Sequence, residues 1–246
     1  MNIYGPGFYF SNFITLLKSR YTFCNVITDF LQRFNKDFSV SAKMDTCASK
    51  NPISTITVYC GSSLGKRTEY GVAAEGLGKE MLKHNIGLVY GSGKEGMMGV
   101  ISKTISDGGG KVTGIIPTLF FDNFTPHYGG TVEMGYGETI VVDSMHIRKQ
   151  MMCDRADAFI AMPGGVGTME EIVEMITWSN LKLHKKPLGL LNVCNYFDGF
   201  MQWYNHAVKE GFIQEIHSNL VIVESNPALL IEKIIERANK KPHDKS

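Results

Sequence analysis

The 246-residue sequence has almost no net charge and lacks a long hydrophobic run. Lys and Arg number 25 and Asp and Glu number 24, so the net charge is +1. A chain without a charge excess has no broad electrostatic attraction to nucleic acid or to an anionic membrane, and neither is expected as a partner. No apolar stretch approaches the roughly 20 residues of a membrane-spanning helix. An anionic ligand would therefore need a local site.

The sequence also lacks the cysteine and histidine spacings of metal sites and disulfide frameworks. Its five cysteines lie far apart without a C-x-x-C pair, and its seven histidines include no H-x-H or H-x-x-x-H pair. This spacing argues against a zinc site. It favours reduced thiols in an intracellular compartment, and a cytoplasmic location is expected.

The first fifty residues differ in composition from the rest. Residues 1–28 are rich in aromatic side chains and contain Lys18 and Arg20, and no acidic residue precedes Asp29. This composition permits an organelle-targeting segment, and a poorly ordered or loosely docked extension is an equal alternative. We expect an N-terminal extension at residues 1–50 and one folded domain at residues 51–246.

From residue 54 onward, short apolar runs alternate with segments of helical period. Strands are expected at 55–60, 86–90, 111–117, 138–142, 157–162, 186–193 and 219–224, and helices at about 70–81, 96–107, 144–155, 168–182, 196–209 and 226–238. Repeated β-α-β units predict a Rossmann-like, doubly wound α/β fold with a mainly parallel sheet and helices on both faces. Residues 118–137 are expected to form a loop.

Glycine-rich turns follow three of the expected strands: CGSS at 60–63, YGSGKEGMMG at 90–99 and MPGGVGTMEE at 162–171. In open parallel sheets, ligands bind beyond the carboxyl ends of the strands. We therefore expect the three turns to open on one edge of the sheet and to form the ligand site.

The second turn satisfies G-x-G-x-x-G at Gly91, Gly93 and Gly96. In dinucleotide-binding dehydrogenases this motif follows the first strand, and an acidic residue ends the next one. Here it follows the second strand, and the third ends in Ile115-Ile116-Pro117. Nicotinamide dinucleotide binding is therefore the weakest functional hypothesis, and close packing or a tight turn beside a ligand is the favoured interpretation.

The third turn has the composition of a phosphate-binding loop. Its glycines free the backbone N–H groups to face an anion, and the following helix adds the positive end of its dipole. We expect an anion at Gly164–Thr168, with Thr168 as the N-cap of a helix that begins near this residue.

Two carboxylates, Glu170 and Glu171, follow this turn. A structural interpretation is a capping box from Thr168 to Glu171, which contributes on the order of 1 kcal/mol. A functional interpretation places the Glu171 carboxylate beside a bound ribose, where it would stabilise the positive charge that develops as an N-glycosidic bond breaks. A capping box needs no glycine-rich loop, so the combination favours the functional interpretation.

The segment MHIRKQMM at 145–152 lies on the helix expected after the fourth strand. It could form a solvated, charged helix face. Alternatively, Arg148 and Lys149 could reach the rim of the phosphate loop, where a guanidinium suits phosphate or carboxylate partners. His146 could donate a proton to a leaving base, although a packed or surface histidine is the more common case.

Together these segments resemble the Lonely guy family of cytokinin-activating phosphoribohydrolases, whose signature is P-G-G-x-G-T-x-x-E preceded by M-H-x-R-K. Residues 163–171 and 145–149 match every fixed position, and the similarity extends from about residue 55 to about 225. The resemblance implies a homodimer that hydrolyses N6-prenyladenosine 5′-monophosphates to the free base and ribose 5-phosphate. It implies no metal and no organic cofactor.

By matched position, the resemblance makes Arg148 and Glu171 the catalytic pair. The implied substrate-binding residues are Lys149, Gly164, Gly165, Val166, Gly167, Thr168, Met169, Glu170 and Thr177. Proteins of this kind are often labelled lysine decarboxylases, but no lysine stands in a persuasive Schiff-base setting for pyridoxal phosphate.

The chain departs from the family pattern at Ser92, where glycine is usual, at Val166, where an aromatic residue is usual, and across residues 118–137. These departures leave the preferred base open among prenylated adenine, plain adenine and other bases. The alternative function is a carrier that binds a nucleotide or pterin nucleotide without hydrolysing it. The presence of both Arg148 and Glu171 argues against that alternative.

Overall fold

The computed structural model describes residues 51–122 and 135–240. The predicted N-terminal extension and its targeting segment lie outside the described residues, as does most of the predicted loop at 118–137. Within the described residues, no helix is long and apolar enough to cross a membrane.

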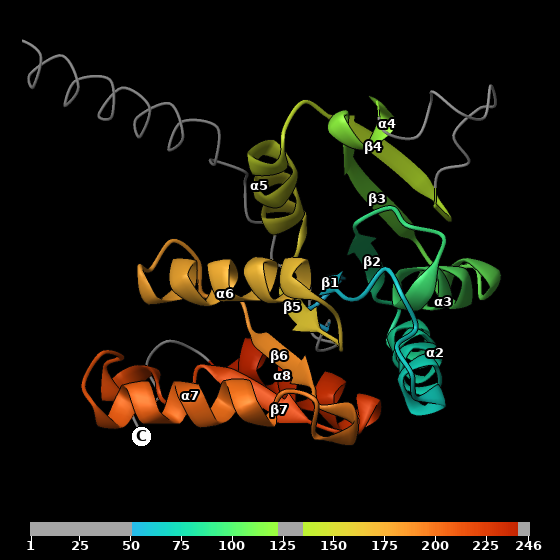
Figure 1. Cartoon of the computed structure of the whole chain (residues 1–246). Helices are drawn as coiled ribbons and strands as arrows, with labels where there is room; N and C mark the ends of the chain where they lie inside the picture. Colours follow the sequence, from blue (N-terminus) through green and yellow to red (C-terminus); the bar gives the residue numbers. More distant parts are fainter. Residues whose placement is uncertain (1–50, 123–134, 241–246) are drawn as a thin grey trace, which may run out of the picture. The chain divides into compact units, whose positions relative to one another are not determined.

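All seven expected strands are present, and they form one sheet. They are β1 (Thr55–Tyr59), β2 (Gly87–Tyr90), β3 (Val112–Pro117), β4 (Glu138–Val142), β5 (Ala158–Ala161), β6 (Leu188–Leu191) and β7 (Val221–Glu224). Every neighbouring pair is parallel, in the spatial order β4-β3-β2-β1-β5-β6-β7 (Figure 1). The prediction of a mainly parallel sheet is confirmed.

The strand order reverses at β1. The chain builds outward from β1 to β4 and then returns, so that β5 pairs with the other side of β1. At such a switch point the loops that follow the two central strands lead away from each other and leave a crevice at the carboxyl edge. A ligand site is therefore expected at the turns after β1 and β5.

Helices cover both faces of the sheet, as predicted for a doubly wound fold. The described α-helices are α2 (Thr68–Lys83), α3 (Gly96–Asp107), α4 (Leu119–Asp122), α5 (Met145–Arg155), α6 (Val166–Asn180), α7 (Asp198–Lys209) and α8 (Pro227–Asn239), and two short 3₁₀ helices, η1 (Val193–Asn195) and η2 (Glu215–His217), flank α7. Residues of α2, α3 and α8 share one buried core, and residues of α5, α6 and α7 share the other. Along β1, Ile56 and Val58 enter the first core and Tyr59 the second, as the two-residue period of a strand requires.

Most strands and helices begin or end one or two residues from the expected positions, and two of the differences concern the segment before β4 and the helix after β5. The segment at 118–137 begins with the short helix α4 rather than with loop. The helix after β5 begins at Val166 and ends at Asn180, two residues earlier at each end than predicted. The glycines after α3 suit the end of a helix, because Gly109 has a φ of 74°, in the left-handed region that favours glycine.

Candidate active site

The three glycine-rich turns meet at the carboxyl edge of β2, β1 and β5, as predicted. The Gly61 N–H donates to the Pro163 carbonyl at 3.1 Å, and the Gly61 carbonyl accepts from the Met97 N–H at 3.1 Å. Gly96 has a φ of 60°, and a Cβ there would lie 2.3 Å from the Ser62 carbonyl carbon. Gly96 therefore permits close backbone packing, in agreement with the favoured interpretation of the G-x-G-x-x-G motif.

The turn after β5 enters α6 with a glycine at the N-cap. Gly165 is the N-cap residue and provides no side-chain cap, so the helix begins at Val166. The predicted N-cap at Thr168 is wrong, because Thr168 lies buried inside the first turn of α6. The structural alternative, a capping box from Thr168 to Glu171, is wrong for the same reason, since Glu171 lies in the second turn and is too far along the helix to cap it.

The three glycines of this turn differ in what they do for the fold. A Cβ on Gly164 would lie 2.1 Å from Oγ1 of Thr168 and 2.8 Å from the Gly61 nitrogen. At Gly165 and Gly167 a Cβ would meet no atom within 4 Å, and neither residue has a positive φ. The described fold requires glycine at 164 but not at 165 or 167, whereas a ligand lying against the exposed backbone would require it there.

Alanine substitutions should separate these two roles. Gly164→Ala is expected to lower the free energy of unfolding by about 2 kcal/mol, because the new methyl group overlaps packed atoms. Gly165→Ala and Gly167→Ala should each change it by less than about 1 kcal/mol. Both should nevertheless weaken binding of ribose 5-phosphate roughly tenfold or more, measured by calorimetry. Unchanged affinity in both variants would contradict an anion site at this turn.

Arg148 and Glu171 form a buried ion pair beside the turn. The Arg148 Nη2 atom on α5 lies 3.2 Å from Oε1 of Glu171 on α6, and the two side chains are only 11% and 10% exposed. Arg148 precedes the core residue Met152 by one helical turn, so the two share the sheet-facing side of α5. The alternative of a solvated helix face is therefore wrong for Arg148.

Two local features hold Arg148 in place. The hydroxyl of Ser144, the N-cap of α5, accepts a hydrogen bond from the Ile147 N–H at 3.2 Å and fixes the start of the helix. A Cβ at Gly91 would lie 2.5 Å from Nη2 of Arg148. The first glycine of the G-x-G-x-x-G motif thus makes room for the guanidinium, a role that the sequence alone did not indicate.

Lys149 joins α5 to α6 a second time. Its ammonium group forms ion pairs with Glu170 and, at 3.1 Å, with Oε1 of Glu174, and its side chain is 8% exposed. Burial acts to lower the pKa of Lys149, but the hydrogen bonds to the two carboxylates leave that pKa raised, so the group stays protonated. Glu174 was not among the expected site residues, although its spacing of four from Glu170 puts it on the same side of α6.

The carboxyl group of Glu171 titrates near neutrality. Burial raises its pKa to about 7, although Arg148 acts to lower that pKa. Lys149 also acts to lower it, and Glu170 and Glu174 act to raise it. A carboxyl group held in this range, in contact with one guanidinium, is typical of a functional acid or base.

Other expected residues lie around the pair at different depths. Val166 is 87% exposed at the start of α6, and Met169 is half-buried against the second core. Thr177 is exposed one and a half turns beyond Glu171, and its hydroxyl donates to the Val173 carbonyl at 2.8 Å. His146 is exposed on the first turn of α5.

Tyr196 is a rim residue that the sequence analysis did not identify. Its hydroxyl donates a hydrogen bond to the Gly164 carbonyl, and its ring packs edge-on against Tyr70 with centroids 5.9 Å apart. Tyr196 follows β6, the neighbour of β5. The rule that ligand sites gather at the carboxyl ends of adjacent strands could therefore have indicated it.

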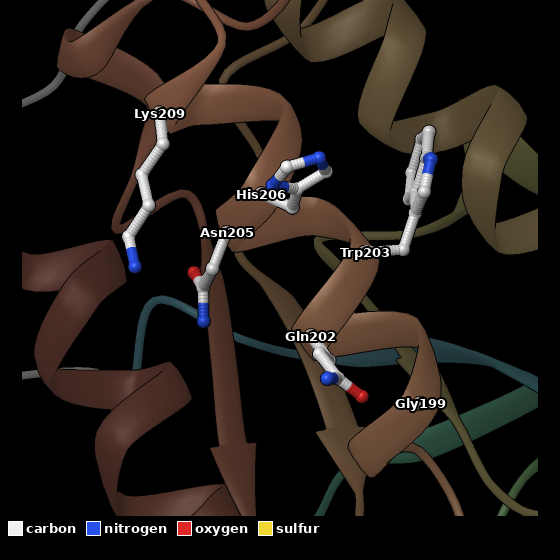
Figure 2. A pocket seen from close by; sticks show the side chains of 6 residues that line it. All are labelled: Gly199, Gln202, Trp203, Asn205, His206 and Lys209. Carbon is white, nitrogen blue, oxygen red and sulfur yellow. The ribbon is translucent and has the colours of Figure 1, made fainter.

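A separate surface hollow follows α7 and lacks the features of this site. It is lined by Gly199, Gln202, Trp203, Asn205, His206 and Lys209. Figure 2 shows these side chains spread along one helix, without a shared point toward which they converge. None of them is a carboxylate, and none comes from α5, α6 or the glycine-rich turns. Across the described residues there is also no group of three His, Cys, Asp or Glu side chains that could hold a metal ion.

Comparison with known proteins identifies a matching protein family and similar plant proteins. Residues 98–234 match the protein family described as "Possible lysine decarboxylase". The chain is 44% identical over 190 residues to the cytokinin riboside 5′-monophosphate phosphoribohydrolase LOG3 of Arabidopsis thaliana, covering 77% of this chain and 85% of that protein. It is also 44% identical over 188 residues to LOG4 of the same plant, covering 76% and 84%.

Solved structures of molybdenum cofactor proteins share the fold. The carrier protein of Chlamydomonas reinhardtii superposes with a TM-score of 0.55 at 21% identity, covering 76% of this chain and 98% of that one. The binding protein of Rippkaea orientalis gives a TM-score of 0.54 at 21% identity, covering 74% and 95%. At this identity the likeness shows the fold alone.

Proposed function

The chain belongs to the Lonely guy family of cytokinin riboside 5′-monophosphate phosphoribohydrolases, and we propose that it hydrolyses the N-glycosidic bond of an N6-substituted adenosine 5′-monophosphate. The products are the free base and ribose 5-phosphate. One structural observation supports the proposal independently of the relatives: the buried Arg148–Glu171 pair lies beside the start of α6, whose N-cap is a glycine.

The first step is binding of the phosphate at Gly164–Thr168. The opening N–H groups of α6 lack a side-chain cap from Gly165, and the positive end of the helix dipole favours an anion there. Gly165 and Gly167 let phosphate oxygens approach the backbone, and the turn itself is braced by the hydrogen bond from Tyr196. This contact would orient the ribose toward Glu171.

The second step is cleavage at the anomeric carbon of the ribose. As the bond to the base nitrogen breaks, the electron pair leaves with the base and positive charge develops on the sugar. The ionised Glu171 carboxylate stabilises that charge and accepts a hydrogen bond from the attacking water, whose oxygen forms the new bond to the sugar. The water gives one proton to bulk solvent through Glu171 and keeps its other hydrogen in the new hydroxyl of the sugar, and the departing base takes up one proton from solvent.

Arg148 and Lys149 keep Glu171 ready for this role. Arg148 acts to lower the pKa of Glu171 and so favours its ionised form, and its guanidinium fixes the carboxylate in one orientation. Lys149 engages Glu170 and Glu174, and its single positive charge offsets part of the repulsion between these carboxylates and the phosphate. Thr168, Met169 and Thr177 are proposed as further substrate contacts along α6.

The ionisation of Glu171 predicts the pH dependence of hydrolysis. With a pKa raised to about 7, the working carboxylate is lost as the pH falls. We expect kcat/KM for the free enzyme to decline about tenfold per pH unit below pH 7 and to level off above it. The substrate phosphate ionises near pH 6. The Glu171→Gln variant should therefore lose the decline of kcat/KM near pH 7, which is due to Glu171. Any decline near pH 6, which is due to the substrate phosphate, should remain in its residual turnover.

The direct test is incubation of the purified protein with isopentenyladenosine monophosphate and with AMP, followed by chromatography for free base. Release of base and ribose 5-phosphate in equal amounts supports the proposal. Recovery of an intact nucleotide, tightly bound and never cleaved, would favour a carrier instead. The ratio of the two rates would identify the preferred base, which the exposed Val166 is placed to influence.

We also propose that the working unit is a homodimer. Ile147 on α5 and Val166 on α6 are 45% and 87% exposed, and they lie on the two helices that carry Arg148 and Glu171. The edge strand β4 adds the half-exposed Val141. Exposed aliphatic side chains beside a site are suited to an interface between subunits. Light scattering of the full chain should give about twice the 27.4 kDa of one chain.

A further inference from the structure

Three buried polar atoms near the Arg148–Glu171 pair have no hydrogen-bond partner among the described residues. They are the Tyr59 hydroxyl, Nε of Arg148 and Oε2 of Glu174. Buried polar atoms of a folded protein are nearly always satisfied, either by protein groups or by an internal water. Electrostatic interaction links Tyr59 to both Arg148 and Glu174, so these three residues share one neighbourhood. Oδ1 of Asn180 is also unsatisfied but lies at the end of α6.

Tyr59 is the last residue of β1, directly before the first glycine-rich turn. It is 1% exposed, and its ring stacks on Phe159 of β5 with centroids 6.2 Å apart. It points into the core shared with α5 and α6, where the neighbouring Thr57 hydroxyl donates to the Met152 carbonyl of α5 at 2.9 Å. The aromatic ring is fully explained by packing, whereas the hydroxyl is not.

The surroundings of the hydroxyl are polar and charged. Burial raises the pKa of Tyr59, and the electrostatic influence of Glu171, Cys153 and Glu174 raises it further while Arg148 acts to lower it. The hydroxyl therefore stays protonated, within electrostatic range of Arg148 and Glu171.

The three atoms are complementary in hydrogen bonding. Nε–H of Arg148 is a donor, Oε2 of Glu174 is an acceptor, and a tyrosine hydroxyl is both. An internal water typically makes about three hydrogen bonds of this mixed kind. We propose that Tyr59 is a positioning residue, whose hydroxyl binds one internal water together with Arg148 and Glu174 and thereby holds the Arg148 guanidinium against Glu171. This inference rests on the proposed function for its catalytic meaning.

Removing the hydroxyl has a defined electrostatic consequence. Without it the water is bound less well, the guanidinium is held less firmly, and the buried carboxylate of Glu171 is less well solvated. Each effect disfavours the ionised form, so the pKa of Glu171 should rise. The substitution changes none of the charged groups that act on Glu171, which are Arg148 and Lys149 from α5 and Glu170 and Glu174 from α6; it changes only how firmly Arg148 is held. Cys60, which follows β1 and is itself influenced by Glu171, is also retained.

The test compares Tyr59→Phe with Tyr204→Phe. Tyr204 is an equally buried tyrosine on α7, whose hydroxyl donates to the His217 carbonyl at 2.9 Å away from the site. The midpoint of Glu171 is followed in the unliganded protein by ¹³C NMR of labelled glutamate, with the resonance assigned by its loss in Glu171→Gln. Tyr59→Phe should raise this midpoint by roughly half to one pH unit, the equivalent of one lost hydrogen bond. Tyr204→Phe should leave it unchanged.

Turnover provides the second readout. Tyr59→Phe should move the acid limb of kcat/KM upward by the same amount and lower kcat about threefold to tenfold with little change in KM. A midpoint equal to that of the wild type, with only a lower melting temperature, would overturn the inference and leave Tyr59 as a packing residue. Because the NMR titration needs no substrate, a protein that fails to hydrolyse any nucleotide would refute the proposed function without affecting this test.

Discussion

Replacement of Glu171 by glutamine is expected to lower kcat for a nucleoside 5′-monophosphate by about three powers of ten. The amide keeps the shape of the side chain and an oxygen acceptor for Arg148, but it removes the negative charge. A carboxylate about 4 Å from the developing charge on the ribose, at an effective dielectric constant near 20, is worth up to about 4 kcal/mol. The KM should change little, because the phosphate contacts remain. Release of free base, followed by chromatography under saturating substrate, measures the effect.

The same variant should be more stable than the wild type at alkaline pH. The pKa of Glu171 is raised from 4.5 to about 7 on folding, so the folded state holds the proton more tightly and wild-type stability falls as the pH rises through this window. Between pH 5 and pH 8 this loss amounts to about 2 to 3 kcal/mol, and the glutamine variant does not suffer it. Urea unfolding of both proteins at the two pH values isolates the difference.

A matched control is available on the opposite face of the sheet. Glu80 is a buried glutamate on α2, paired with Lys83 at 2.7 Å, and it belongs to no part of the site. Glu80→Gln should leave kcat within about twofold of the wild-type value. If Glu171→Gln retained full turnover and merely lost stability, Glu171 would be a structural residue and the proposed mechanism would be wrong.

Replacement of Arg148 by alanine should lower kcat/KM by about two to three powers of ten. A buried carboxylate that loses its charged partner is costly to keep ionised, because the pair is only about one-tenth exposed. Since Arg148 acts to lower the pKa of Glu171, its removal should raise that pKa above 7 and move the acid limb of the pH profile upward. Part of the loss should therefore be recovered by assay at pH 9, which separates the electrostatic effect from misfolding.

Arg155 provides the control for this experiment. It ends the same helix, is exposed, and lies two turns from Arg148. Arg155→Ala should leave both kcat/KM and the position of the acid limb unchanged. An Arg148→Ala variant that keeps the wild-type pH profile, whatever its rate, would show that the guanidinium does not control the ionisation of Glu171.

The sequence predicted the sheet well, because its strands carry a strong signal. The runs at 157–162 and 186–193 are apolar on both faces, and only a central parallel strand accommodates that pattern. The meeting of three turns at one edge also followed from the sequence, because carboxyl ends of parallel strands share an edge. The order of the strands did not follow, since it depends on which helices cross which face.

The details of the site were less accessible to sequence reasoning. Thr168 was assigned as an N-cap because threonine is common at that position, but the flanking glycines let the helix start earlier. The role of Gly91 depends on a side chain from α5, more than fifty residues later in the chain. The strand pattern does not predict that the Tyr59 hydroxyl is buried without a hydrogen-bond partner, because tyrosine is common in strands for other reasons. Contacts between distant segments carry this information, and composition does not.

The reversal of strand order at β1 also bears on how such proteins diversify. Arg148, Glu171 and the glycine-rich turn after β5 all lie near the middle of the sheet, whereas β4 and β7 form its outer borders. Changes in the length or the side chains of these two border strands should therefore leave the arrangement of Arg148 and Glu171 unchanged.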